Sequence, residues 1–328
     1  MPVRKTSAHC SISDPDRHIP VYKRLRSMKD SPASLRIQLA ITMAIFGTVG
    51  LVRRNIPMDS LLLAGIRAFL GAASLYAVIR IKGRKLSVDR IRSRFWLIVL
   101  VGIIMGFNWV FLFESFNHTS VATATVCYYM EPVFLILASP FVFHERITLP
   151  KLVCVILSFI GMIFVSGVLN ASFSGIAELK GVFFGLLAAL FYALCVIWNK
   201  TITDVPVFDR TLIELLAAGS VLFPLSSIHG DLASLSRMAT AAWGWVMLLG
   251  LINTGVSYGV YFTVVEHLPL QTVAIYSFLD PVLAICFSYF LFHEPMGKAG
   301  LFGTIMIIGS TFISELLTVI CPGKTKRK

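Results

Sequence analysis

Residues 118–145 read HTSVATATVCYYMEPVFLILASPFVFHE and residues 267–294 read HLPLQTVAIYSFLDPVLAICFSYFLFHE, so one segment repeats the other at a constant shift of 149 residues. Both copies place a proline, Pro132 or Pro281, directly after an acidic residue, and both end with the tripeptide Phe-His-Glu. A repeat at a fixed period is typical of a duplicated architecture. We therefore expect the chain to consist of two similar halves.

The chain around these segments is apolar. Hydrophobic residues make up 56% of the 328 residues and charged residues 14%, whereas a soluble domain has about 25% charged residues. The apolar residues form ten runs of about 18 to 24 residues, each long enough to cross a hydrocarbon core of about 30 Å as a helix. The sequence therefore predicts an all-α membrane protein with ten transmembrane helices. The runs are 34–52, 58–79, 95–115, 119–142, 150–169, 181–199, 211–228, 242–264, 269–292 and 298–320.

The basic residues predict the orientation of these helices. With the N-terminus in the cytoplasm, 23 of the 29 lysines and arginines lie in cytoplasmic loops and tails, and five lie on the other side. This bias agrees with the positive-inside rule. Each half has five helices, and because five is odd, the second half enters the membrane from the opposite side. We therefore expect two inverted repeats, both termini in the cytoplasm, and a basic cytoplasmic loop at 80–94.

The segments next to the repeated stretch carry a further pattern. Helix 3 contains Gly-Phe-Asn-Trp-Val-Phe-Leu-Phe-Glu-Ser-Phe at 106–116, and helix 4 begins with the small residues of 120–125. In these features the chain resembles the EamA domain of the drug/metabolite transporter superfamily, and it does so twice. It departs from that family in helix 1, where Phe46-Gly47 stands in place of a tryptophan-glycine pair. The other matching features are Pro132, Glu145, Gly161 and Gly167 in the first copy, and Thr272-Val-Ala, Pro281, Glu294, Gly303 and Gly309 in the second.

The resemblance implies a carrier of small metabolites in the plasma (inner) membrane, often an exporter of amino acids or similar amphiphilic solutes. It also implies a central cavity lined by helices 1, 3 and 4 and by their counterparts 6, 8 and 9, with helices 5 and 10 as a packing wall. The expected organisation is a cytoplasmic basic tail at 1–33, an EamA-like repeat at 34–169, a second repeat at 181–320 and a basic tail at 321–328.

Three ionisable residues fall near the middle of predicted helices, namely Arg67, Glu131 and Asp280. A charge at the centre of a membrane helix costs roughly 2.5–3.5 kcal/mol, so such a residue faces protein or water and marks a pathway. For Arg67 the alternative is an ion pair that only holds helices together. Pro132 and Pro281 lack the backbone N–H that would bond a carbonyl one turn earlier, so each acid lies beside a predicted kink. A kink that serves packing alone is the alternative there.

Aromatic and amide residues complete the predicted site. Trp109 in helix 3 aligns with Tyr258 in helix 8 under the same shift, and Tyr128 and Tyr276 precede the two acids by about one turn. Repeat-related positions of this kind favour a shared cavity. The predicted substrate-binding residues are Arg67, Asn108, Trp109, Tyr128, Glu131, Tyr258, Tyr276 and Asp280.

Motifs of other function classes are missing from the sequence. There is no Gly-rich phosphate loop and no metal-binding or nucleophile–histidine pattern on a helix face. We therefore expect no enzymatic activity, no cofactor and no metal, and any uphill movement must use a gradient. Because a low-dielectric cavity favours the neutral form of a carboxyl group, Glu131 and Asp280 are the candidates for carrying a coupling proton. Facilitated movement without coupling is the alternative.

The expected partners follow from the same features. They are a small-molecule substrate, protons and the lipid bilayer, whose anionic headgroups account for the +12 net charge without any nucleic acid. The sequence leaves open whether the chain forms a homodimer. The alternative function from another class is a membrane-embedded lipid-handling enzyme or a component of a lipid flippase.

Overall fold

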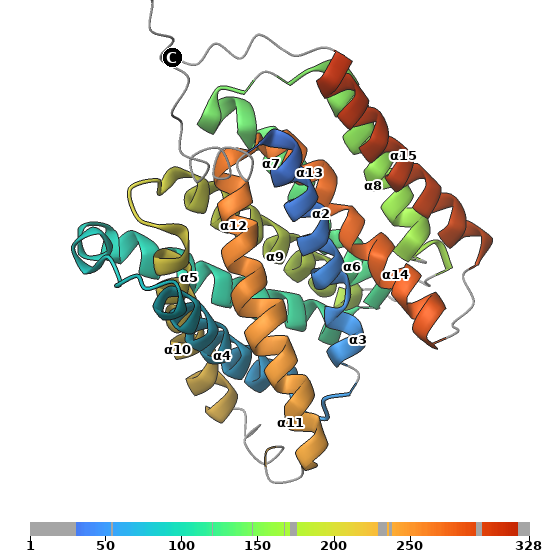
Figure 1. The fold of residues 1–328 in the computed structure, drawn as a ribbon. Coiled ribbons are helices and arrows are strands. Elements are labelled where there is room, and N and C mark those ends of the chain that lie inside the picture. The colour runs from blue at the N-terminus through green and yellow to red at the C-terminus, as the bar shows by residue number, and fades with distance from the viewer. Residues whose placement is uncertain are drawn as a thin grey trace, which may run out of the picture.

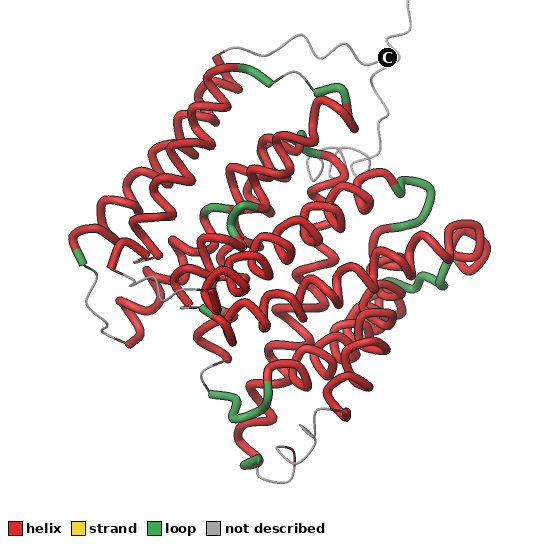
Figure 2. The backbone as a smooth tube through the Cα atoms, turned by 180° about the vertical axis from the view of Figure 1, so that it is seen from behind, coloured by secondary structure: helices red, strands yellow, loops and turns green. Residues whose placement is uncertain are grey.

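The structure is a computed structural model of the chain. It describes residues 31–53, 55–119, 121–145, 147–166, 168–170, 176–228, 235, 238–292 and 297–320. The regular elements in these residues are all helices, and no strand occurs among them (Figures 1 and 2). The predicted basic tails lie outside the described residues, except for 31–33, and so do Arg146, His293 and Glu294.

Local sequence signals set where the helices of the first half begin. The side chain of Ser31 accepts a hydrogen bond from the backbone N–H of Ser34 at 3.2 Å, and Pro32 follows it. The side chain of Asp59 accepts one from the backbone N–H of Leu61 at 2.8 Å. Serine and aspartate are favoured N-caps, and proline suits the first helical position. The elements are α2 (Pro32–Gly47), α3 (Val49–Arg53), α4 (Ser60–Ile81), α5 (Val88–His118), α6 (Val121–Tyr128), α7 (Glu131–Phe143), α8 (Leu149–Ser166) and η1 (Val168–Asn170).

The helices of the second half follow in the same order. A π-helix, η3, joins α11 to α12 without interruption, and π-helical turns inside α-helices are often found at functional sites. The elements are α9 (Ile176–Thr201), α10 (Val207–Ile228), α11 (Thr240–Met247), η3 (Leu248–Val256), α12 (Ser257–His267), α13 (Leu270–Ser277), α14 (Leu279–Phe292) and α15 (Lys298–Ile320).

The described helices include seven spans that are long and apolar enough to cross a membrane. Three shorter apolar helices cover Leu149–Phe164, Leu270–Ala284 and Lys298–Ser314. All ten predicted apolar runs therefore fall on helices, and the all-α membrane class is confirmed. The number of crossings and their direction stay predictions.

The predicted basic loop at 80–94 is wrong in its extent. α4 continues to Ile81 and α5 begins at Val88, so the connection covers only 82–87. Ile91 and Ile98 are buried while the basic residues between them are exposed, which gives the first turns of α5 an amphipathic pattern. α5 has 31 residues, or roughly 46 Å, and is thus longer than the hydrocarbon core is thick. These charged residues belong to a helix that extends beyond the apolar layer.

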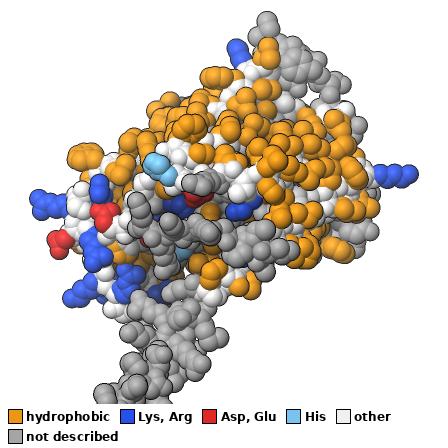
Figure 3. All heavy atoms as spheres, turned by 90° about the horizontal axis from the view of Figure 1, so that it is seen from above, with side chains coloured by type: hydrophobic (Ala, Val, Ile, Leu, Met, Phe, Trp, Pro, Cys, Tyr) orange, Lys and Arg blue, Asp and Glu red, His pale blue; other side chains and the backbone are white. Residues whose placement is uncertain are grey.

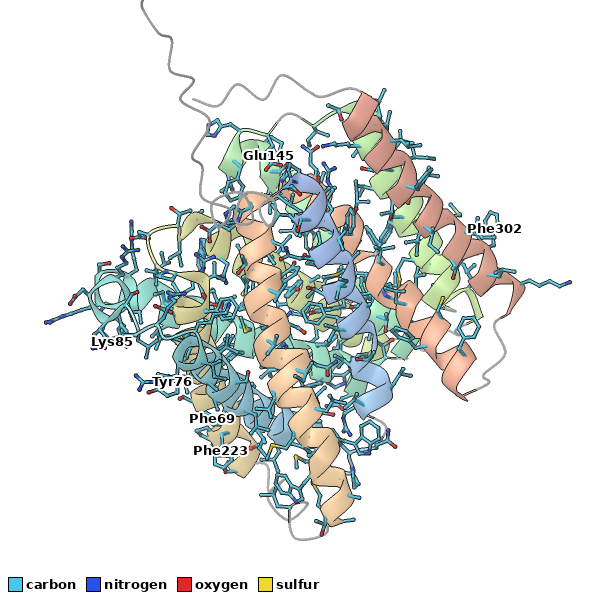
Figure 4. The ribbon with its side chains drawn as sticks, in the orientation of Figure 1. Phe69, Tyr76, Lys85, Glu145, Phe223 and Phe302 are labelled. Carbon is cyan, nitrogen blue, oxygen red and sulfur yellow. The ribbon has the colours of Figure 1, made fainter. Side chains whose placement is uncertain are left out.

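Helices of the two halves pack in a pattern that stays the same when the halves are exchanged. α5 packs on α9 and α10, and in the same way α12 packs on α2 while η3 packs on α4. α4 and α8 each pack on their own counterparts, α10 and α15. The rings of Phe69 on α4 and Phe223 on α10 lie 6.3 Å apart (Figure 4). Each half therefore provides the other with equivalent neighbours.

α8 and α15 lie side by side at one edge of the molecule (Figures 1 and 2). Their backbones approach so closely that a Cβ atom at Gly161 would lie 2.8 Å from the carbonyl oxygen of Gly303. Small residues at such crossings allow close packing where no hydrophobic driving force acts between helices. This pair occupies the position of a wall beside the other helices.

Several helices are interrupted near the middle of the molecule. α6 ends just before Glu131, and α13 gives way to α14 at Phe278, so the kinks predicted at Pro132 and Pro281 are confirmed. α2 and α3 are separated at Thr48. The amide of Asn253 on η3 donates to the Ile45 carbonyl and to the Thr48 hydroxyl, both at 2.8 Å. Irregular backbone of this kind is tolerated at membrane depth only inside protein or beside a cavity.

Candidate functional site

A cavity of about 180 Å³ lies between the two halves, beside the helix interruptions. A larger hollow of about 490 Å³, lined by His118, Lys180 and three apolar residues, lies at the ends of α5 and α9. That hollow is open at the surface and has no carboxyl group among its lining residues, so the central cavity is the candidate site. Its lining residues are Met43, Phe46, Val49, Arg67, Trp109, Leu112, Tyr128, Tyr129, Glu131, Tyr192, Asn253, Thr254, Tyr258, Ser277 and Asp280.

Arg67 supplies the positive charge of the cavity. Its guanidinium lies over the Trp109 ring, 4.2 Å from the ring centroid. A cation held over an indole face is attracted by the quadrupole of the ring. Within the described residues Nε of Arg67 has no hydrogen-bond partner and no ion pair of Arg67 is found. The stacking thus orients the guanidinium and leaves donor groups for a ligand.

The two acids of the cavity come from opposite halves. Glu131 begins α7 and is 3% exposed, and within the described residues its Oε1 has no hydrogen-bond partner. Asp280 lies on the first turn of α14, where its Oδ2 accepts a hydrogen bond from the hydroxyl of Tyr129 at 2.8 Å. This bond joins the first half to the second. An unpaired oxygen on a buried carboxyl group is costly, so Oε1 of Glu131 is suited to accept a hydrogen bond from a ligand.

Aromatic rings form much of the remaining wall. The Tyr258 ring contacts Phe46, with centroids 5.5 Å apart, and Trp109, with centroids 6.3 Å apart. On the other side the Tyr128 ring lies 5.9 Å from that of Tyr192. Aromatic side chains with polar tips offer a ligand both apolar contact and hydrogen bonding. The cavity therefore suits a small amphiphilic molecule that carries charges of both signs.

The duplicated sequence matches one known family in both halves. The profile of the EamA-like transporter family covers residues 35–167 and again residues 179–316. The chain belongs to this family.

Named relatives of this EamA-like transporter are themselves transporters. It is 31% identical over 253 residues to the uncharacterized transporter YxxF of Bacillus subtilis, covering 76% of this chain and 79% of that protein. It is 24% identical over 221 residues to the S-adenosylmethionine uptake transporter of Rickettsia conorii, covering 67% and 71% of the two chains. A solved crystal structure superimposes with a TM-score of 0.77 at 17% identity, over 87% of this chain and 99% of that one. The last match shows a shared fold.

In this EamA-like transporter, six of the eight predicted site residues line the central cavity. Asn108 and Tyr276 do not. Asn108 is fully buried between α5 and α9, where its Nδ2 donates to the Ala188 carbonyl at 2.7 Å. Adjacent residues on a helix point about 100° apart, so Asn108 and Trp109 do not share a face. Tyr276 packs against the apolar core, whereas its neighbour Ser277 lines the cavity.

Sequence reasoning did not single out several lining residues of the EamA-like transporter. Tyr129 is the most consequential, because its hydroxyl holds Asp280 from the opposite half. Thr254 and Ser277 contribute hydroxyl groups next to helix irregularities. No spacing rule finds these residues, since a π-helix or a break shifts the face that the rest of the helix would predict.

A second group of charges in the EamA-like transporter corrects two sequence interpretations. From the sequence, Glu214 would lie near a helix end within reach of water and Arg210 would be a cytoplasmic charge, yet both are fully buried. Nε of Arg210 donates to Asn199 Oδ1 at 3.0 Å, and Asn199 Nδ2 donates to Glu214 Oε2 at 3.2 Å. Nη2 of Arg210 also lies 3.2 Å from Glu266 Oε2. Because α9, α10 and α12 each contribute partners, this network depends on the tertiary fold and lies outside the cavity.

Proposed function

We propose that this EamA-like transporter moves a zwitterionic small metabolite, such as an amino acid, across the plasma membrane. The observation that carries the proposal is a cavity between aromatic walls with two carboxyl groups and with Arg67, which has no ion pair within the described residues. Arg67 is suited to a substrate carboxylate, because its planar fork binds such groups through two hydrogen bonds. Glu131 and Asp280 are suited to a substrate ammonium group. Charged residues at membrane depth are retained for functions of this kind.

The proposed mechanism is alternating access between two inverted five-helix repeats. Support comes from the twofold match to the family profile and from the correspondence of helix pairs between the halves, such as α5 on α9 and α12 on α2. If each of the ten apolar helices crosses the membrane once, the halves have opposite orientations. Exchange of the two conformations then moves the opening of the cavity from one side to the other.

The proposed direction is export, on the resemblance to metabolite exporters. The Rickettsia relative is named for uptake of S-adenosylmethionine, a compound with an amino-acid end, which supports the substrate class but gives the opposite direction. Flux therefore has to be measured both ways. The acids Glu131 and Asp280 are the proposed carriers of a coupling proton.

We expect purified protein in liposomes to give saturable flux of labelled amino acids, and Arg67→Gln to reduce it about tenfold or more, as expected for loss of a charged hydrogen bond. The matched control is Arg94→Gln, because Arg94 forms an exposed ion pair with Asp204, with Nε 2.9 Å from Oδ2. Lipid turnover and lipid flipping are followed in the same vesicles. Lipid activity without solute flux would favour the lipid-handling alternative and contradict the proposal.

We further propose that both termini face the cytoplasm. Exposed basic residues gather along the end of α4 and the start of α5, and Figure 3 shows lysine and arginine side chains at one side of a largely hydrophobic surface. A single cysteine at Lys85 (labelled in Figure 4) should react with an impermeant maleimide only from the cytoplasmic side. A cysteine at Lys298 should react only from outside. Labelling of position 85 from outside would contradict the orientation.

A further inference from the structure

The short turn between α12 and α13 is held by one side chain that follows α7 and by another near the end of α9. The backbone N–H of Leu270, at the start of α13, donates to Glu145 Oε1 at 3.2 Å. The ammonium of Lys200, at the end of α9, donates to the carbonyls of Val265, at 3.0 Å, and of Leu268. Glu145 belongs to the first half and the turn to the second. The contact between Glu145 and Leu270 therefore crosses between the halves.

The backbone before Glu145 directs its side chain to this turn. α7 ends at Phe143, and the next residue, His144, has a φ of 54° and is the one non-glycine residue with positive φ among the described residues. The left-handed conformation costs roughly 1–2 kcal/mol for such a residue. The N–H of Glu145 then bonds back to the Ser139 carbonyl at 3.3 Å. Glu145 is thereby placed at the top of α7 (Figure 4), at the N-terminus of α13, where a carboxylate is favoured by the helix dipole.

Packed side chains separate this contact from the cavity. The residues of α12 that follow the cavity-lining Tyr258 are packed, and Tyr261, Phe262 and Val265 are at most 1% exposed. In α5, which starts at this end, the lining residues Trp109 and Leu112 lie in the last third of the helix. The cavity therefore occupies the half of the molecule away from the turn. Between the cavity and the turn the space is filled by side chains.

The contact is also weak enough to be broken. Glu145 makes its bond to Leu270 at 3.2 Å, longer than the 2.7–2.9 Å typical of a charge-assisted hydrogen bond, and within the described residues its Oε2 has no hydrogen-bond partner. Lys200 lies near Glu145 and 5.4 Å from the centroid of the Phe143 ring. Glu145 and Lys200 thus attract each other across the two halves, but no direct ion pair between them is found within the described residues.

We propose that Glu145 and Lys200 form a latch that holds the cytoplasmic end of the transporter closed and is released each time the cavity opens to that side. This inference rests on the proposed alternating access. It gives a role to the Phe-His-Glu tripeptide at 143–145, which the cavity itself does not use. Both residues act on access to the site and not on the substrate.

The native Cys195 offers a reporter for the latch. It is fully buried in α9, near Tyr258 at the cavity wall and one turn from Asn199. A variant that keeps only this cysteine is reconstituted in both orientations and labelled with an impermeant maleimide. Glu145→Ala should raise the rate of Cys195 labelling from the cytoplasmic side about tenfold, as expected for loss of one charged hydrogen bond in the closed state. Glu145→Gln, which keeps an acceptor but loses the charge, should give a smaller rise.

A second reporter separates gating from loosening of the fold. With Leu112→Cys as the only cysteine, Glu145→Ala should lower labelling from the opposite side, because one end closes as the other opens. The control is Glu114→Ala, which removes an exposed acid 3.6 Å from His118 and should change neither rate. Unchanged labelling, or a rise at both reporters, would overturn the latch. If wild-type vesicles move no solute, the proposed function fails; if flux is normal and labelling is unchanged, the latch alone fails.

Discussion

Replacing Glu131 by Gln and Asp280 by Asn is expected to abolish uphill transport while leaving solute exchange largely intact. Both side chains line the central cavity, one from each half. The amide analogues keep the shape of the carboxyl group and its ability to accept hydrogen bonds, so Tyr129 can still donate to residue 280. They cannot bind and release a proton. Coupling to a proton gradient is therefore lost, whereas exchange of substrate for substrate needs no net proton movement.

The measurement compares two assays on the same vesicles. With an imposed proton gradient, the variants should bring the substrate only to equal concentrations on both sides, while exchange of internal for external substrate continues. The matched control is Glu114→Gln, since Glu114 lies on the same helix as Trp109 but outside the cavity lining. We expect Asp280→Asn to have the larger effect, because its shorter side chain holds the charge closer to the kink. Folded variants that still concentrate substrate would show that both acids are structural.

Replacing Arg210 by Met is expected to lower the free energy of unfolding by about 3–5 kcal/mol, the usual cost of removing one partner of a buried charge pair. The guanidinium has no exposed surface and contacts Asn199, Glu266 and the Ile202 carbonyl. Without the guanidinium, the carboxylate of Glu266 has lost its ion-pair partner. Asn199, which donates to Glu214, has lost the hydrogen bond from Arg210. Methionine fills a similar volume, so the loss reflects charge more than packing.

The effect is measured by thermal and denaturant unfolding in detergent. Arg94→Met is the matched control. The hydrogen bond from Arg94 lowers the pKa of Asp204, but both side chains are about half exposed. We therefore expect this variant to lose less than about 1 kcal/mol of unfolding free energy. Adding Glu214→Gln and Glu266→Gln to Arg210→Met should restore part of the stability, because the uncompensated charges are removed together. Equal stability of the Arg210 and Arg94 variants would mean that water enters the network.

The helices and their interruptions were largely predictable from the sequence. A run of about 20 apolar residues can cross a bilayer as a helix, because a helix forms all of its backbone hydrogen bonds internally. Each predicted run accordingly falls on a described helix. Proline acts through its own ring and missing N–H, so the breaks beside Glu131 and Asp280 were also visible locally. The fixed period of 118–145 and 267–294 indicated the duplication that the family profile finds twice.

The partners of the charged side chains were decided by the tertiary structure alone. Tyr129 reaches Asp280, 151 positions away, and Glu145 reaches Leu270, 125 positions away. The amphipathic signal that reveals a buried face in soluble helices is weak when lipid and core are equally apolar. After a break or a π-helix, the side chains of the following turns point in directions that the residue spacing in the sequence does not predict. The packing of the helices therefore decides which face meets the cavity, so that Asn108 and Tyr276 face the protein core, whereas Arg67 and Trp109 meet at one cavity.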